Sequence, residues 1–277
     1  MKHDYFSLLL TRRKINSSFI PAASPWPFLT AQTLFCFLFN IVLWFHYYLY
    51  SVEKVLFSAA CLSFIVSFWI KDIIIESQYL GAYTLQNNKE LRSGFVFFLI
   101  SEIMFFFSLF WAFFHFSLVP SVWIGCVWPP YGIETIPAFG LPFLNTIILV
   151  SSGFTLTYVQ KVIIENKKDA RRNANLGFLI TLFLAGLFLF VQYYEFTHAP
   201  FSINDSVYGS IFFFITGFHG IHVIIGTIFI LVVFLRFYDN HFYVENTLAL
   251  DCAAWYWHFV DVVWLFVFFV VYWWGGN

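Results

Sequence analysis

Long apolar runs separated by short polar stretches are the dominant pattern along this chain. At about 1.5 Å per residue, a helix formed by any of these runs is long enough to cross a hydrocarbon core of about 30 Å. The pattern therefore predicts an all-α integral membrane protein, a bundle of seven transmembrane helices. We expect these spans at about 28–50, 54–73, 92–118, 142–164, 174–197, 207–236 and 250–274.

The composition supports the membrane class. Hydrophobic residues make up 61% of the chain and charged residues only 10%, with a mean hydropathy of +0.79. An ordinary soluble domain carries about a quarter charged residues and less than half apolar ones. The composition therefore excludes a soluble domain, and the formal net charge of −1 makes the placement of charges more informative than their sum.

The basic residues predict the orientation of the chain. If the N-terminus faces the negative side of the membrane, every lysine and arginine except Lys54 lies on that side. The positive-inside rule strongly favours this arrangement. Because the number of spans is odd, the C-terminus then faces outward. The basic run Arg12-Arg13-Lys14 fits a topology anchor, since no apolar stretch with a cleavage site follows it directly.

Glu102 lies deep in the predicted third span. An ionisable group at that depth costs several kcal/mol unless it is paired or protonated, so a functional role is one hypothesis. A structural hydrogen bond to a neighbouring helix is the other. His222 lies at a similar distance from the inner membrane surface on the sixth span, which predicts a Glu102–His222 pair.

His219 and His222 are three residues apart, so they share one helix face. This spacing can present two metal ligands, as Glu-x-x-His motifs do in bundle sites. A di-iron site would need further carboxylates of that kind, and we find none. Haem ligation would need a facing histidine, and His258 is a candidate. Histidines that hydrogen-bond between helices are the more common case.

His258 and Asp261 repeat the same spacing on the last span. Each group lowers the cost of burying the other, and we favour a role in helix packing over one in catalysis. The four cysteines form no CxxC pair: Cys36, Cys61, Cys126 and Cys252. The chain also has no Ser-His-Asp candidate, no glycine-rich phosphate loop and no haem attachment motif.

Four residues mark the predicted inner ends of the second and sixth spans: Trp69, Glu76, Arg236 and His241. Groups at the headgroup level can bind lipid phosphates or amines. Simple anchoring of the helices at the interface is the alternative.

Several motifs resemble the cytochrome c oxidase subunit 3 family of haem-copper oxidases. The strongest are AWYWHFVDVVWLF at 254–266 and TGFHGIHVIIG at 216–226, with SPWP at 24–27 and WPP at 128–130 as further matches. The matches keep their order from residue 24 to residue 274. A run of 13 residues does not match by chance, so the resemblance is specific and covers most of the chain.

The resemblance implies a fold and a role. The fold is a single membrane domain over 1–277, with an N-terminal segment at 1–27 on the matrix side. Helices 1–2 (28–75) are splayed from helices 3–7 (92–274) by a lipid-filled cleft. The complex passes electrons from cytochrome c to oxygen and pumps protons. The resemblance implies a non-catalytic subunit that supports subunit 1, binds lipids in the cleft and sustains proton uptake.

The resemblance also implies partners and residue roles. We expect haem a, haem a3 and copper in partner subunits, no cofactor or metal in this chain, and no nucleic-acid partner. Its partners would be subunit 1 as the main contact, subunit 2, accessory subunits and phospholipids of the mitochondrial inner membrane. Glu102 matches the buried carboxylate of the family, and Glu76, Arg236 and His241 match positions near lipid headgroups. Tyr83 departs from the histidine of animal relatives.

Two other functions stay open at this point. A seven-span transporter would predict broken helices or a polar pore face, whereas these spans are largely uninterrupted. The matching subunit of a quinol oxidase is the second alternative, because the family motifs alone do not identify the electron donor of the complex.

Overall fold

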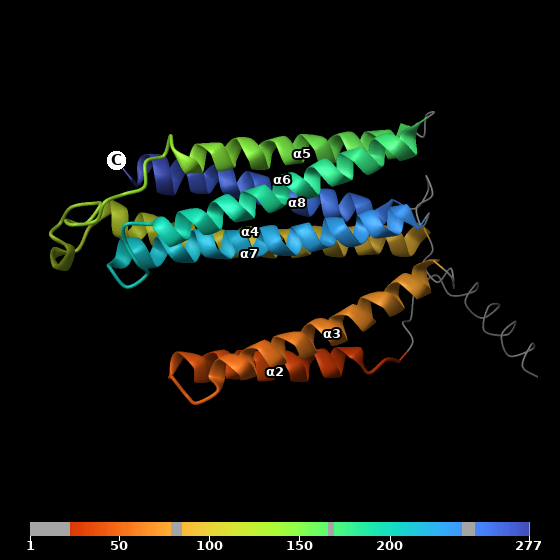
Figure 1. The fold of residues 1–277 in the computed structure, drawn as a ribbon, viewed down its shortest axis with the longest axis horizontal. Helices are drawn as coiled ribbons and strands as arrows, with labels where there is room; N and C mark the ends of the chain where they lie inside the picture. Colours follow the sequence, from red (N-terminus) through yellow and green to blue (C-terminus); the bar gives the residue numbers. More distant parts are fainter. Residues whose placement is uncertain (1–22, 79–84, 166–168, 240–246, 277) are drawn as a thin grey trace, which may run out of the picture. The chain divides into compact units, whose positions relative to one another are not determined.

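The computed structural model describes residues 23–78, 85–165, 169–239 and 247–276. Within these ranges the chain is helical, without a strand, and seven helices are long and apolar enough to cross a membrane (Figure 1). The prediction of an all-α protein with seven spans is confirmed. The chain divides into two compact units, 1–91 and 92–277, which are described separately.

Unit 1 is a helical hairpin of α2 (Trp26–Phe45) and α3 (Ser51–Gln78). The turn between the two helices contains Tyr47 and Tyr50, each with a φ of 56°. A left-handed residue cannot continue a right-handed helix, so α2 ends at Phe45 and not at the predicted residue 50. For the same reason α3 begins at Ser51, before the predicted residue 54.

Polar contacts join the two helices of unit 1 near both ends. The Trp26 indole N–H donates a hydrogen bond of 2.5 Å to the Asp72 carboxylate, and its ring stacks on Phe68. Near the turn, the Asn40 amide donates to the Lys54 carbonyl at 3.3 Å. These bonds satisfy polar groups that lipid could not satisfy.

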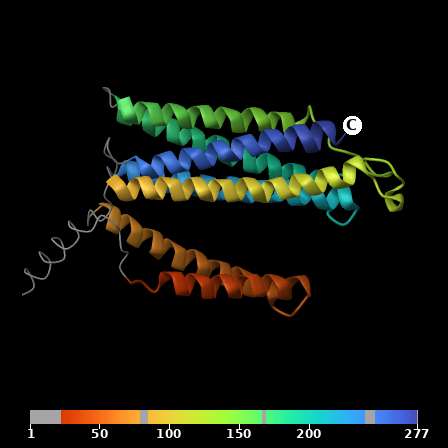
Figure 2. The same cartoon turned by 180° about the vertical axis from the view of Figure 1, so that it is seen from behind.

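Unit 2 contains five long helices that run alternately up and down (Figure 1 and Figure 2). They are α4 (Leu85–Leu118), which enters the unit at Arg92, α5 (Leu141–Glu165), α6 (Ala170–His198), α7 (Val207–Tyr238) and α8 (Leu248–Val267). The π-helical segment η2 (Phe268–Trp274) continues α8, and the short 3₁₀ helix η1 (Val122–Ile124) lies between α4 and α5.

Several helices extend beyond the predicted spans. The helix α4 begins at Leu85 where we predicted residue 92, and α3 continues to Gln78 beyond residue 73. Hydropathy marks only the part of a helix that lies in hydrocarbon. The polar residues before Arg92 include glutamine, lysine and glutamate, which have good helix propensity and therefore extend the helix into the interface.

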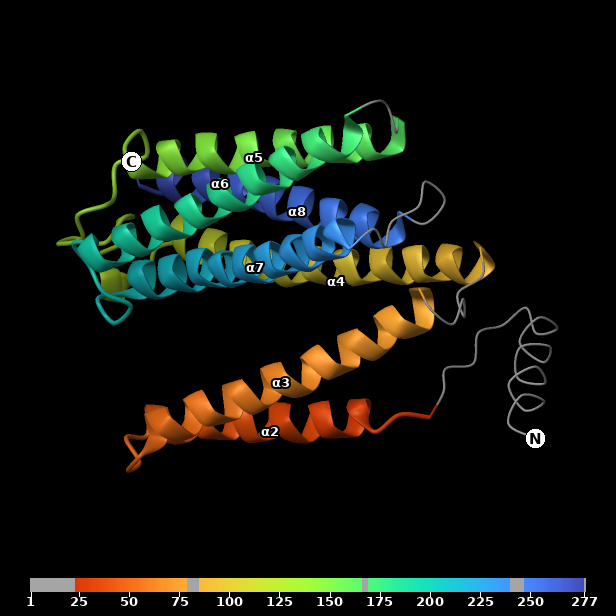
Figure 3. The same ribbon diagram turned by 45° about the vertical axis from the view of Figure 1, so that its right-hand side comes forward.

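Helix α8 lies at the centre of unit 2 and is the most buried of the seven spans. Helices α6 and α8 each pack against both α5 and α7. The contact between α5 and α6 is extensive (Figure 3). The core is aromatic, with Trp257 and Trp264 fully buried on α8. Gly226 on α7 lets α8 approach closely, because a Cβ at this position would lie 2.9 Å from Trp257 Cε3.

Helix α4 packs on α7 and α8 through rings. Phe105 meets Phe218 with centroids 5.1 Å apart, and Phe106 meets Phe259 at 6.0 Å. The outward side chains of the unit are largely apolar, as on α7, where Phe214, Ile221, Ile225 and Ile228 are exposed. Such a surface is suited to lipid, which offers no hydrogen bonds.

The cations of unit 2 gather at one end of the bundle. They lie at the starts of α4 and α6 and near the ends of α5 and α7, which the alternating directions bring together: Arg92, Lys161, Arg171, Arg172 and Arg236. At the opposite end, the described loops at 119–140 and 199–206 contain no lysine or arginine. We call these the basic end and the non-basic end.

Candidate polar sites within the helix bundle

Glu102 on α4 and His222 on α7 are in direct contact. The His222 Nε2 atom lies 2.9 Å from Glu102 Oε2, and His222 Nδ1 donates to the Phe218 carbonyl at 2.7 Å. Because a carbonyl only accepts, Nδ1 carries a hydrogen. The remaining contact then holds one proton, either on the imidazole or on the carboxyl group. The pair has no net charge in either case.

Aromatic rings enclose this pair. Phe106 lies 4.9 Å from the His222 ring, and Tyr256 and Phe259 lie at 6.4 and 6.5 Å, all measured between centroids. The side chains of His222 and Glu102 are 11% and 23% exposed. Exclusion of water strengthens the electrostatic attraction between the partners. The arrangement can therefore hold a proton between two helices.

His219 makes contacts different from those of His222. Its Nε2 atom donates to the Val260 carbonyl of α8 at 3.2 Å, and its ring packs on Trp264 at 5.0 Å. The two histidines share a helix face, but His219 hydrogen-bonds to α8 and His222 to α4. They do not converge on one point. Among the residues that the structure describes, no three His, Cys, Asp or Glu side chains form a group that could hold a metal.

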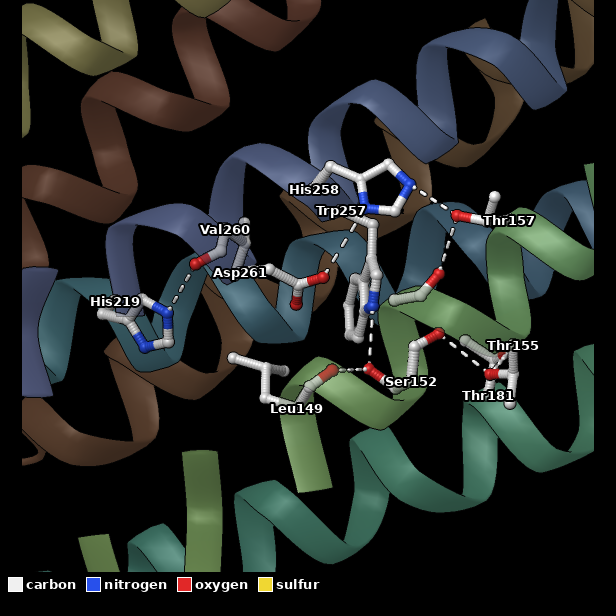
Figure 4. A network of polar contacts seen from close by, with 11 residues as sticks. Leu149, Ser152, Thr155, Thr157, Thr181, His219, Trp257, His258, Val260 and Asp261 are labelled. Carbon is white, nitrogen blue, oxygen red and sulfur yellow. Dashed lines mark hydrogen bonds and ion pairs between the residues drawn. The ribbon is translucent and has the colours of Figure 1, made fainter. Parts of the chain in front are cut away.

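His258 and Asp261 lie where α8 meets α5 (Figure 4). His258 Nε2 is 3.1 Å from the Thr157 hydroxyl, and His258 Nδ1 is 3.7 Å from Asp261 Oδ2. The Asp261 carboxylate lies against Gly153 of α5, where a Cβ would overlap it. Only glycine at this position therefore admits the carboxylate between the two helices.

Two tryptophans tie α8 to α5 beside this contact. Trp257 Nε1 donates to the Ser152 hydroxyl at 3.0 Å, and Trp264 Nε1 donates to the Thr146 hydroxyl at 2.9 Å. A buried indole N–H usually finds a partner of this kind. These bonds give the α5–α8 contact a defined register, which positions His258 and Asp261.

Sequence reasoning missed a fourth polar cluster. Tyr272 of η2 donates to Glu195 Oε1, and Gln192 of α6 donates to the same oxygen at 3.4 Å. Asn145 of α5 donates to Gln192 Oε1 at 3.3 Å. All four side chains are buried. We call this set the Glu195 cluster. A glutamate three residues from a glutamine in an apolar span was the available signal, but Glu195 is close enough to the end of α6 to be taken for an interfacial group.

The predicted lipid-binding residues lie in different parts of the chain. Trp69 and Glu76 are partly exposed on α3 of unit 1, and Arg236 is partly exposed near the end of α7 in unit 2. His241 falls outside the described residues. Their assignment to lipid stays a prediction.

The basic end of unit 2 also contains an ion pair that we did not predict. Arg92 Nη2 lies 2.5 Å from Asp251 Oδ2, which also accepts from the Thr247 hydroxyl at 3.1 Å. Arg171 donates to the Tyr238 carbonyl at 2.9 Å and so connects α6 to α7. Because Arg92 is 45% exposed, we expect its pair to contribute about 1 kcal/mol or less.

Comparison with known proteins gives a match over nearly the whole chain. The sequence profile described as "Cytochrome c oxidase subunit III" matches residues 17–276. The chain belongs to the cytochrome c oxidase subunit 3 family. Members of this family from distant organisms are similar over nearly their full length. Identity is 43% with the Marchantia polymorpha protein, covering 92% of this chain and 95% of the relative.

Two further subunit 3 proteins show the same level of similarity. The Yarrowia lipolytica protein is 40% identical over 97% of this chain and 99% of its own length. The Drosophila melanogaster protein is 44% identical over 91% of this chain and 95% of its own. The resemblance seen in the motifs is therefore confirmed, and the matched range contains every residue of the polar sites described above.

Proposed function

We propose that this chain is a non-catalytic core subunit of cytochrome c oxidase in the mitochondrial inner membrane. The observation that carries the proposal is the family match over 17–276, with relatives named cytochrome c oxidase subunit 3. In this role the chain packs on subunit 1, contacts subunit 2 and accessory subunits, and supports the transfer of electrons from cytochrome c to oxygen.

The redox centres, haem a, haem a3 and copper, then belong to partner subunits. The contacts of the three histidines that were weighed as metal or haem ligands support this assignment. His219, His222 and His258 hydrogen-bond to three different neighbours, a carbonyl, a carboxyl and a hydroxyl group. These contacts join helices to one another, as expected for a supporting subunit.

A role in proton uptake is supported by Glu102 and His222. Their contact holds one proton near the middle of the bilayer without a net charge. We propose that the pair sustains proton uptake by the complex through this proton. Phospholipids are the second proposed ligand, bound in the cleft implied by the resemblance, with Trp69, Glu76, Arg236 and His241 near their headgroups.

The orientation belongs to the same proposal. The basic end of unit 2 fits the matrix side, where the positive-inside rule favours lysine and arginine. The non-basic end then faces the intermembrane space. We therefore propose that the N-terminus lies on the matrix side, as the lysine and arginine pattern of the sequence predicts, and the C-terminus in the intermembrane space.

Gentle purification of the chain from its own membrane tests the proposal. We expect it to bring down haem a together with a subunit that carries a two-copper centre. Haem without that centre would indicate a quinol oxidase instead. Isolation of the chain without any haem protein would contradict both oxidase assignments and would favour a transporter.

A further inference from the structure

The Glu195 cluster lies inside unit 2, about one helical turn from the non-basic end. Glu195 is three residues before the end of α6, and Asn145 is four residues after the start of α5, which places them about 5 and 6 Å from these helix ends. At this depth a polar side chain could reach the membrane interface. Both side chains are buried in the bundle instead, since Glu195 is 3% exposed and Asn145 0%. The cluster is therefore shielded from bulk water.

The hydrogen bonds of the cluster leave two of its oxygen atoms open. Glu195 Oε1 accepts from both Tyr272 and Gln192, and Gln192 Oε1 accepts from Asn145. Glu195 Oε2 and Asn145 Oδ1 are buried and make no hydrogen bond with any residue that the structure describes. Buried polar atoms almost always have a partner. Because Gln192 contacts both residues, the two open oxygens belong to neighbouring groups.

Among the described residues, none with a positive charge pairs with Glu195. Its hydrogen-bond partners, Tyr272 and Gln192, are neutral groups, and so is Tyr208 of α7, which is near enough to interact with it electrostatically. The described loops at the non-basic end contain no lysine or arginine, and the side chain of His198 is exposed. A buried carboxylate without a cation is costly, whereas the protonated acid is neutral. The balance of charge therefore favours a proton on Glu195.

We propose that Glu195 holds a proton on Oε2 and that an internal water molecule binds this proton and donates in turn to Asn145 Oδ1. The proton belongs on Oε2 because Oε1 already accepts two hydrogen bonds. It needs an acceptor, and Asn145 Oδ1 needs a donor. One water molecule satisfies both, since it can accept and donate at once. A bound Ca²⁺ ion would need about six or more oxygen ligands, whereas the described cluster leaves two open.

The inference gives unit 2 a second site that holds a proton. The first is the Glu102–His222 contact between α4 and α7. The second lies toward the non-basic end, where α5, α6 and η2 meet, and its proton is bound by water and not by an imidazole. The argument uses only the contacts within unit 2, so it does not depend on the proposed function.

Infrared spectroscopy of the purified complex tests the protonation of Glu195. A protonated carboxyl group absorbs apart from carboxylates and amides, so Glu195→Gln should remove one band from that region. Glu134→Gln is the matched control, because Glu134 is exposed in the loop 119–140 at the same end, where a glutamate loses its proton at neutral pH. This control should leave the region unchanged. If Glu195→Gln removes no band, the carboxyl is ionised and the inference is overturned.

The water itself is tested on the unaltered complex, so this measurement does not require any variant to assemble. In an electron cryomicroscopy map that resolves water, we expect density at about 3 Å from both Glu195 Oε2 and Asn145 Oδ1. A map with well-defined side chains and no density between these two atoms would overturn the inference, and so would a metal ion there. The haem and copper content of the same preparation tests the proposed function separately.

Discussion

At the residue scale, the buried polar groups of unit 2 are shared between helices. Glu102 is bound by His222, and Asp261 lies beside His258. The Glu195 carboxyl accepts from both Tyr272 and Gln192. Each of these contacts joins side chains from different helices or from different turns of one helix. Removing one member therefore leaves a buried polar group with fewer partners, which costs more than the contact itself contributes.

The Glu102–His222 pair provides the first prediction. His222→Leu leaves the Glu102 carboxyl unpartnered and should lower the stability of the purified complex by about 1–3 kcal/mol. Replacing both residues by leucine should cost clearly less than the two single changes added together, because no polar group is then left without a partner. Thermal unfolding of the wild type, the two single variants and the double variant gives the coupling free energy between the two residues. Strictly additive losses would show that the contact contributes nothing.

The Glu195 cluster provides the second prediction. Tyr272→Phe removes one hydroxyl and keeps the ring in contact with Phe212 and Trp264. We expect a loss of about 1–2 kcal/mol, since the buried Glu195 carboxyl loses a donor. Tyr193→Phe is the control, because Tyr193 is on α6 nearby but 69% exposed. Thermal unfolding of the complex should separate the two variants, and equal melting temperatures would argue against a structural role for the cluster.

Sequence reasoning found some of these residues and missed others for a physical reason. Glu102 stands out because a charge deep in an apolar span is costly, and its depth pointed to His222. The bonds from Trp257 and Trp264 to hydroxyls of α5 depend on which helices are neighbours. Hydropathy along one chain does not contain that information. The Glu195 cluster draws on α5, α6 and η2, so the same limit applies to it.

At the element scale, the approach of α7 to α8 depends on one small residue. Gly226→Ala places a methyl group 2.9 Å from the buried Trp257 ring. We expect overpacking of about 1–3 kcal/mol. Gly217→Ala in the same helix meets nothing within 4 Å, so it should be neutral or stabilise the helix by up to about 1 kcal/mol. Thermal unfolding of the complex is the measurement, and equal effects of the two changes would contradict close packing at Gly226.

The boundaries of elements were less predictable than their number. Apolar length identifies a span, but it does not show where a helix stops outside the hydrocarbon. The left-handed residues Tyr47 and Tyr50 carry no strong turn signal, since neither is glycine or asparagine. The π-helical geometry of η2 likewise leaves no mark in an apolar sequence such as FFVVYWW. Tyr272, which donates to Glu195, lies in this segment.

At the scale of the whole molecule, the asymmetry of charge predicts the direction of insertion. Cys126 provides a native probe, because it is exposed in the loop 119–140 at the non-basic end, whereas Cys252 is buried and Cys36 and Cys61 lie within the apolar helices α2 and α3. In sealed vesicles of known orientation, a membrane-impermeant maleimide should label Cys126 only from the intermembrane-space side. Cys126→Ser should abolish this labelling. Labelling from the matrix side would reverse the proposed topology.

Fold class and span number could be predicted at this scale because both depend on total apolar length, which the chain displays directly. Within unit 2, the described cations lie at one end as the prediction requires, since helices that alternate in direction bring every second connection to the same end. The function could not be inferred from the pattern of apolar and charged residues alone. The polar pairs alone are consistent with many membrane bundles, and the family match is what relates them to an oxidase.

The ring contacts of α4 have a mechanical consequence. Contacts such as Phe105 with Phe218 and Phe106 with Phe259 are numerous and individually weak, and ring pairs tolerate small sliding movements. The Glu102–His222 bond, by contrast, holds α4 to α7 at one height in the membrane. The Arg92–Asp251 ion pair also connects the first part of α4 to α8, so we expect only the part of α4 beyond Glu102 to tilt slightly. The proton that the pair holds would stay in place while this part of the helix moves.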